Sequence, residues 1–170
     1  AGTESGMYIS FDDGANWQPF QLNLPVVPIT DLTLKNKDLI LATQGRSFWV
    51  LDDLSPLHSL STEVSNKAFV LYNPRSTYRI FGSEGGGRNG KNPPKGVILN
   101  FNLKELKKDQ KVRIDILESD GSLIKSFQSG VDKKSLKPEL QLGLLEVKEG
   151  LNRFAWDMRY PGVKQFKGLI

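Results

Sequence analysis

Two adjacent carboxylate pairs, Asp12 with Asp13 and Asp52 with Asp53, are the first side chains whose type and spacing suggest hydrolytic chemistry. A glycoside hydrolase needs two carboxyl groups about 5–10 Å apart, one as an acid and one as a base or nucleophile. Neighbouring side chains in a strand point to opposite faces, and short acidic side chains in turns accept hydrogen bonds from backbone N–H groups. We therefore expect both pairs to hold turns, and we expect no catalytic residue in this chain.

The sequence offers no second reactive group to work with these acids. His58 is the single histidine, cysteine is absent, and no serine stands in a recognisable nucleophile sequence. Next to Pro56 and Leu57, His58 is expected to be a packed or surface residue. Neither a metal site nor a cofactor site is expected.

A glycine-rich stretch at residues 82–94, GSEGGGRNGKNPP, is another candidate binding element. Successive glycine N–H groups can form a nest for a phosphate group. The Lys-Ser or Lys-Thr of a P-loop does not follow in register, and no helix start follows either. A flexible linker or loop is the favoured interpretation.

The charge pattern does not indicate a nucleic-acid surface. The 170 residues include 23 basic and 19 acidic ones, for a formal net charge of +4. The densest basic run, KELKKDQK at residues 104–111, contains acids and is expected to be a solvated loop between strands. A nucleic-acid surface needs a clustered basic face with stacking aromatic residues. No apolar run approaches the roughly 20 residues that cross a bilayer, so no membrane span is expected.

The stretch SFDDGANW at residues 10–17 has the composition of a tight β-hairpin turn. Ser10 and Asp12 can accept hydrogen bonds from N–H groups across the turn. Gly14 allows a positive φ, and Trp17 offers a large apolar face that can pack back over the hairpin. Asp12 is therefore expected to hold the turn rather than to act in catalysis.

Residues up to about 61 show short strands separated by turn residues. The runs ITDLTL, LILAT and SFWVL, at residues 29–34, 39–43 and 47–51, predict an all-β meander. The near-continuous apolar character of residues 39–41 and 48–51 predicts strands covered on both faces. Helix is not expected here, because the runs are short and rich in β-branched and aromatic residues.

A second strand pattern begins at Gly96. Alternating apolar residues predict strands near residues 97–103, 112–116 and 151–159, and Asp120 with Gly121 predicts a hairpin turn before LIKSF. The apolar residues expected on one face of the first of these strands are Val97, Leu99, Phe101 and Leu103. Residues 62–95 are expected to form a bridge, with short strands at 68–72 and 78–81.

The three tryptophans, Trp17, Trp49 and Trp156, could stack on sugars. Two of them occur at strand positions that are expected to face a core. Core packing is therefore the favoured role for these indole rings.

The pattern S-x-D-x-G-x-x-W formed by Ser10, Asp12, Gly14 and Trp17 resembles the Asp-box, or bacterial neuraminidase repeat, of sialidase-like and sortilin-like β-propellers. The stretch ATQGRSFWVLDD at residues 42–53 resembles the closing blade of related propellers in large exported bacterial proteins, with Gln44 where those relatives usually have histidine. The resemblance implies that residues 1–22 form the outer hairpin of one blade and residues 29–51 three strands of the last. The other strands would come from a longer parent protein, because a closed ring needs at least about four blades.

The run from VRIDIL through SDGSLIK to GLNRFAWDMR resembles the immunoglobulin-like or fibronectin-type-III-like module of flagellar hook-capping proteins. Similar modules follow the propeller in the exported bacterial relatives. The expected organisation is therefore all-β, with the last blade and a half of a propeller at residues 1–61, bridging strands and a glycine-rich loop at 62–95, and a truncated immunoglobulin-like β-sandwich at 96–170.

The resemblance implies a non-catalytic C-terminal region of an exported, sialidase-like or glycoside-hydrolase-like protein, with a structural or carbohydrate- or protein-presenting role. A sortilin-like scaffold that binds proteins or peptides is the alternative, and an intracellular assembly factor is a third. Sialidase catalysis needs three arginines, a tyrosine–glutamate pair and an aspartic acid. Arg46 alone among the arginines lies in a blade, and a salt bridge to Asp52 or Asp53, or a surface position, is favoured for it over the rim of the propeller channel.

The implied partners are the rest of the parent propeller and a glycan or an extracellular protein. Exposed strand edges add the expectation that residues 1–53 pair with another copy or dock on the sandwich. The implied location is extracellular or periplasmic. Because residues 1–4, AGTE, lack the features of a signal peptide, that peptide would lie in the parent protein.

Overall fold

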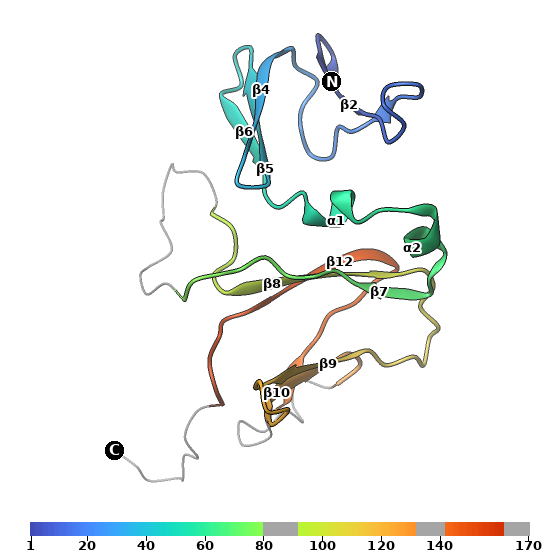
Figure 1. Cartoon of the computed structure of the whole chain (residues 1–170), viewed down its shortest axis with the longest axis vertical. Helices are drawn as coiled ribbons and strands as arrows, with labels where there is room; N and C mark the ends of the chain where they lie inside the picture. Colours follow the sequence, from blue (N-terminus) through green and yellow to red (C-terminus); the bar gives the residue numbers. More distant parts are fainter. Residues whose placement is uncertain (80–91, 132–141, 162–170) are drawn as a thin grey trace. The chain divides into compact units, whose positions relative to one another are not determined.

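The computed structural model describes residues 1–79, 92–131 and 142–161, and within these ranges the chain is built mostly from short strands (Figure 1). The chain divides into two compact units, Ala1–His58 and Ser59–Ile170. The all-β class expected from the sequence is thus confirmed, with two short helices beside the strands.

Unit 1 contains two small antiparallel sheets. The first has the order β1-β2-β3 and the second the order β4-β5-β6. Their strands are β1 (Gly2–Thr3), β2 (Gly6–Ile9), β3 (Gln18–Pro19), β4 (Ile29–Lys35), β5 (Asp38–Thr43) and β6 (Phe48–Leu51). Between β4 and β5 the loop is two residues long, and both Asn36 and Lys37 have positive φ. This geometry matches the right-handed twist of the two strands that the turn connects.

The core of unit 1 lies between these two sheets. Alternation along β5 buries Leu39 and Leu41, and the register places Leu51 and Trp49 beside them on the same face. The buried members of the cluster are Met7, Leu24, Val27, Leu39, Leu41 and Leu54. Core packing is confirmed for the ring of Trp49, which packs against this cluster.

Within the described residues, the second face of the β4-β5-β6 sheet is left largely open. Phe48 and Val50, in β6, point to this face and are 73% and 54% exposed. The expectation that β5 and β6 are covered on both faces was therefore wrong for this chain. Among the described residues, the apolar side chains of β5 and β6 pack against a core on one face of the sheet only.

Two short helices that the strand pattern does not predict follow the β6 strand. They are α1 (Ser55–His58) and α2 (Thr62–Asn66). The expectation of strands and turns alone up to residue 61 was therefore wrong at α1. Pro56 is compatible with α1 because the first turn of a helix needs no N–H donor there. At α2, Ser61 is the N-cap, and its side chain accepts a hydrogen bond from Val64 N.

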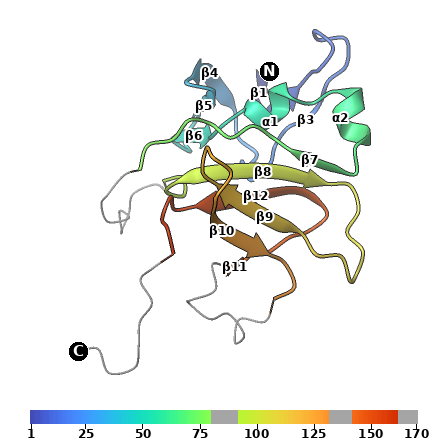
Figure 2. The same cartoon turned by 60° about the horizontal axis from the view of Figure 1, so that its bottom comes forward.

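Unit 2 is a pair of facing sheets with the orders β12-β8-β7 and β11-β10-β9 (Figure 2). The strands are β7 (Phe69–Leu71), β8 (Val97–Leu103), β9 (Arg113–Leu117), β10 (Leu123–Gln128), β11 (Leu142–Leu144) and β12 (Gly150–Trp156). All pairs are antiparallel except β10 with β11, which is parallel. The β7 strand lies in the segment expected to be a bridge, yet it pairs with β8 and so belongs to the sheet.

The core of unit 2 follows the alternation expected from the sequence. Leu99, Phe101 and Leu103 are buried on one face of β8, as predicted, and Phe101 is fully buried. Across the core, the rings of Phe127 and Phe154 lie 4.6 Å apart between centroids. Trp156 also packs against this cluster, so core packing is confirmed for its ring.

Two turns in unit 2 depend on side-chain hydrogen bonds. The hairpin predicted at Asp120 and Gly121 is confirmed, since it joins β9 to β10 and Asp120 Oδ1 accepts a hydrogen bond from Ser122 N at 2.9 Å. The buried amide of Asn152 closes the bend before β12. Its Oδ1 accepts from Lys148 N at 2.8 Å, and its Nδ2 donates to Lys148 O at 2.7 Å.

Several sequence expectations fall outside the described residues. The glycine-rich stretch lies there up to residue 91, as do residues 80–81 of the strand expected at 78–81. Tyr78 and Arg79 are not in a strand. Neither of the helices within the described ranges has the length and apolar character needed to cross a membrane.

Because Phe101 contacts both sheets of unit 2, its truncation should leave a large cavity. We expect Phe101→Ala to lower the free energy of unfolding by about 3–5 kcal/mol. Leu151→Ala is the matched control, because Leu151 is in the neighbouring strand but is 53% exposed, so a change within about 0.5 kcal/mol is expected. Urea unfolding measures both, and equal losses would contradict the placement of the core.

Candidate functional site

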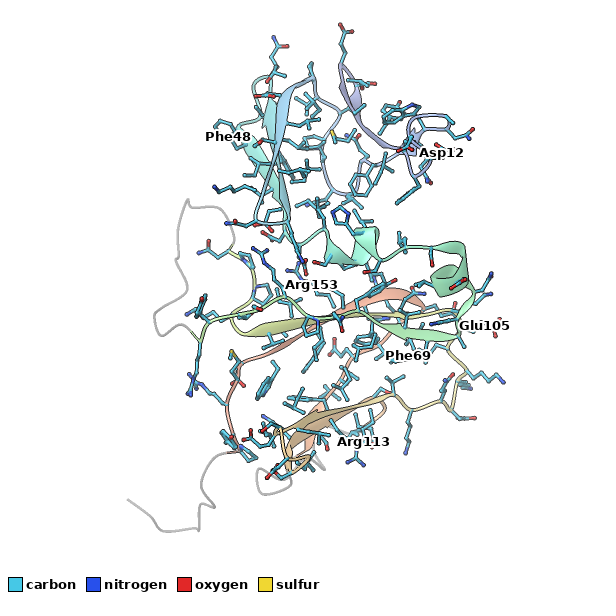
Figure 3. The ribbon with its side chains drawn as sticks, viewed as in Figure 1. Asp12, Phe48, Phe69, Glu105, Arg113 and Arg153 are labelled. Atoms are coloured by element: carbon cyan, nitrogen blue, oxygen red, sulfur yellow. The ribbon has the colours of Figure 1, made fainter. Side chains whose placement is uncertain are left out.

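The candidate site from the sequence, Ser10 to Trp17, forms the turn between β2 and β3. These strands pair as Ile9 with Gln18 and Tyr8 with Pro19, so the turn closes a short antiparallel hairpin. Figure 3 shows Asp12 in this turn. The chemistry of the turn depends on what the side chains of Ser10 and Asp12 contact.

The hydroxyl of Ser10 lies inside the turn and makes three hydrogen bonds. Ser10 Oγ accepts from Gly14 N at 2.8 Å and from Asp12 N at 3.3 Å. It donates to Asp12 Oδ1 at 2.8 Å. A single short side chain therefore satisfies two backbone donors and orients the carboxylate.

The carboxylate of Asp12 spans the turn to Asn16. Oδ1 accepts a hydrogen bond from Asn16 N at 2.8 Å, and Oδ2 accepts one from Asn16 Nδ2 at 2.6 Å. These two bonds, together with that from Ser10, hold the pKa of Asp12 below its usual value of 3.8. The side chain is exposed, yet both of its oxygens already have donors within the turn.

Gly14 and Trp17 complete the turn. Gly14 has φ of +91°, a conformation that side chains other than glycine rarely adopt. A Cβ atom at Gly14 would lie 3.5 Å from Trp17 Cζ2, so the indole lies against the turn backbone. Trp17 is 52% exposed and is not part of the core.

This arrangement is poorly suited to acid–base catalysis. A general acid at neutral pH needs a raised pKa, whereas hydrogen bonding lowers that of Asp12. Its neighbour Asp13 has a positive φ at the tip of the turn. The four residues are together in space, and their contacts stabilise a backbone conformation.

The second carboxylate pair lies at the start of α1. Asp53 Oδ1 accepts a hydrogen bond from Ser55 N at 3.1 Å, and Asp53 N donates to Asp38 Oδ1 at 3.0 Å. Asp53 therefore caps the short helix and ties it to the start of β5. His58, at the end of α1, is exposed.

Arg46 lies in the loop between β5 and β6, and its side chain is exposed. Its carbonyl oxygen accepts a hydrogen bond from Trp49 Nε1 at 3.0 Å. Within the described ranges its guanidinium forms no ion pair with Asp52 or Asp53. Of the alternatives drawn from the sequence, the salt bridge is thus not formed, and Arg46 has a surface position.

A polar cluster on the β9–β10 sheet was not identified from the sequence. Asp115 Oδ1 accepts hydrogen bonds from Ser126 Oγ at 2.6 Å and from Arg113 Nε at 2.7 Å. The bond from Ser126, then that from Arg113, lowers the pKa of Asp115. Arg113 and Asp115 are exposed, whereas Ser126 is buried, and only the strand register brings Ser126 opposite Asp115.

Two hollows in the surface were also not identified from the sequence. The first, in unit 1, is mainly apolar and lies beside β6, where Trp49, Val50 and Leu51 line it together with Phe20 and Leu24. The second, in unit 2, is lined by lysines of the loop between β8 and β9. No described group of three or more His, Cys, Asp or Glu side chains is arranged to hold a metal ion.

Comparison with protein families, curated proteins and solved structures finds no match to this chain.

Replacing the Asp12 carboxylate should loosen the turn. Asp12→Asn keeps the size of the side chain but sets an amide donor or a weaker acceptor against Asn16, so we expect faster hydrogen exchange at the Asn16 amide. Asp13→Asn makes the same charge change, but the Asp13 side chain forms no hydrogen bond within the described residues, so no change is expected. Amide exchange followed by NMR measures both. Unchanged exchange in Asp12→Asn would contradict the role of the carboxylate.

The lowered pKa of Asp12 also makes the turn dependent on pH. Because the folded-state pKa lies below the unfolded one, the carboxylate contributes stability above the unfolded pKa, and this is lost as the pH falls through the folded pKa. Asn16→Ala removes the largest cause of the shift, so the pKa of Asp12 should rise towards 3.8. An NMR titration of the carboxyl carbon measures it. If the pKa of Asp12 does not change in this variant, the shift is due to the hydrogen bonds from the Asn16 backbone and Ser10 instead.

Proposed function

We propose that this chain is a non-catalytic region of an exported, sialidase-like Asp-box β-propeller protein, in which unit 1 supplies blade strands and unit 2 is an immunoglobulin-like module with a structural or presenting role. The observation that carries the proposal is the set of hydrogen bonds that Asp12 accepts. The carboxylate that would be the obvious catalytic group has both oxygens engaged by donors of its own turn.

The geometry of unit 1 supports this proposal. The Asp12 turn lies in a β-hairpin, as an Asp-box turn does, and the next three strands form an antiparallel meander in chain order. The β4-β5-β6 sheet has an apolar residue pair, Phe48 and Val50, on its uncovered face. A blade of a propeller is packed on both faces by neighbouring blades, so an apolar second face fits a blade whose neighbour is supplied by the rest of a parent protein.

Unit 2 supports the second half of the proposal. Its two sheets face each other over a core of alternating inward residues, and all but one of its strand pairs are antiparallel. This is the arrangement of a β-sandwich, although the parallel pair of β10 with β11 is a departure from a simple antiparallel one. A module of this kind fits a role in stabilising or presenting a neighbouring domain. An extracellular or periplasmic location is part of the same proposal.

A protein- or peptide-binding scaffold of sortilin-like type is the second candidate. The observation that favours it is the apolar hollow beside β6, because β6 is the last strand of its sheet in the described residues. An edge strand next to an apolar hollow can add an extended peptide, with the backbone giving affinity and the hollow taking alternate side chains.

Enzyme assays distinguish these functions from hydrolysis. We expect the 170-residue chain to show no turnover of sialosides or aryl glycosides, because both carboxylate oxygens of Asp12 accept hydrogen bonds from its own turn and Asp53 accepts one from Ser55 N. Turnover abolished by one point mutation would overturn the proposal. Capture of extended peptides without hydrolysis, weakened by Leu22→Lys in the exposed lining of the hollow but not by Thr33→Lys on the opposite face of the sheet, would favour the scaffold instead.

A further inference from the structure

The loop between β8 and β9 forms an open hollow at one end of unit 2. We call it the lysine hollow, and the residues lining it are Asn66, Ala68, Phe69, residues 103–105 and residues 107–113. The loop connects the two sheets of the unit, so the hollow lies where β7 and β9 begin and β8 ends. Figure 3 shows Phe69, Glu105 and Arg113 of its lining.

The lining of the hollow has more cationic than acidic side chains. It contains four lysines and Arg113, against the two acids Glu105 and Asp109, in a chain whose net charge is +4. Arg113 is already paired with Asp115 at 2.7 Å. The lysines, which are Lys104, Lys107, Lys108 and Lys111, are exposed and form no ion pair with any described residue.

Hydrogen bonds hold the loop in shape. Lys104 N donates to Ala68 O at 3.0 Å, and Leu106 N donates to Glu149 Oε1 at 3.1 Å. A tight turn is closed by Gln110 N, which donates to Lys107 O at 3.0 Å. These bonds tie the loop to two neighbouring segments, so the lysines sit on a formed backbone. A preorganised surface loses less entropy when it binds a ligand.

An aromatic ring forms part of the wall. Phe69 is 47% exposed, and its ring lies 6.2 Å from the buried ring of Phe101 between centroids. The ring of Phe69 is thus next to a core ring and is also partly open to solvent. Such a ring can pack against the apolar face of a sugar. The carboxylates of Glu105 and Asp109 add acceptors that a hydroxyl group can donate to.

We propose that the lysine hollow binds an anionic polysaccharide that carries carboxylate groups. The lysines can form ion pairs with the carboxylates, and the acids can accept hydrogen bonds from the hydroxyls. The ring of Phe69 can pack against the apolar face of a sugar. A double-stranded DNA backbone offers phosphates but no hydroxyl donors, so Glu105 and Asp109 would repel it with no compensating hydrogen bond, whereas sugar hydroxyls can donate to these acids and offset the repulsion. This inference goes beyond the proposed function, because the hollow lies wholly in unit 2 and does not depend on the Asp12 turn.

Binding of the full 170-residue chain to polygalacturonate tests the proposal, with neutral dextran and double-stranded DNA as comparison ligands. Lys107→Gln with Lys108→Gln should weaken binding of polygalacturonate at least about ten-fold and reduce its salt dependence, since fewer counterions are released. Lys35→Gln with Lys37→Gln, which removes the same charge from exposed positions in unit 1, is the matched control and should leave binding unchanged.

A change of opposite sign separates the charge effect from misfolding. Glu105→Gln keeps an oxygen that can accept a hydrogen bond from a hydroxyl but removes the negative charge that repels the ligand's carboxylates, so binding of polygalacturonate should become several-fold tighter, a result that an unfolded variant would not give. The proposal is overturned if the chain binds none of the polymers, if both lysine pairs weaken binding equally, or if dextran binds as well as polygalacturonate. Tighter binding of DNA than of polygalacturonate would assign the hollow to nucleic acid instead.

Discussion

The structure of each unit depends on covering one apolar sheet face with a second sheet. Three short strands are marginally stable by themselves, and each sheet here has only three described strands. In unit 2 the cover is mutual, and Phe101 is completely buried between the β8 and β10 sheets. In unit 1 the cover is one-sided, because the β4-β5-β6 sheet buries Leu39 and Leu41 but leaves Phe48 exposed.

Polar side chains in this chain mostly stabilise turns and caps. Asp12 and Ser10 satisfy backbone donors in the β2–β3 turn, Asp53 caps α1, and Asn152 closes the bend before β12. Each of these groups could carry chemistry by its type alone. Its hydrogen bonds to neighbouring groups direct it to a structural role. For Asp12, the bonds from the Asn16 side chain, the Asn16 backbone and Ser10 lower the pKa, where catalysis would need it raised.

Two surface hollows lie apart from these turns and caps and remain open for interaction with other molecules. Unit 1 has an apolar hollow at the edge strand β6, and unit 2 has the lysine hollow at the β8–β9 loop. Their lining differs, since the first is mainly apolar and the second is rich in lysines. For both surfaces we propose binding rather than bond cleavage.

The sequence by itself determined the features that depend on near neighbours. Period-two alternation identified the buried face of β8, and Asp120 with Gly121 identified the hairpin turn, because both are local properties of the backbone. Only the tertiary structure decided which strands pair. For example, β7 pairs with β8 although it lies in a segment expected to be a bridge. The tertiary structure also decided the contact of Ser126 with Asp115 and the position of the lysine-rich loop beside Phe69. Such contacts depend on register and on packing between distant segments, which no local pattern specifies.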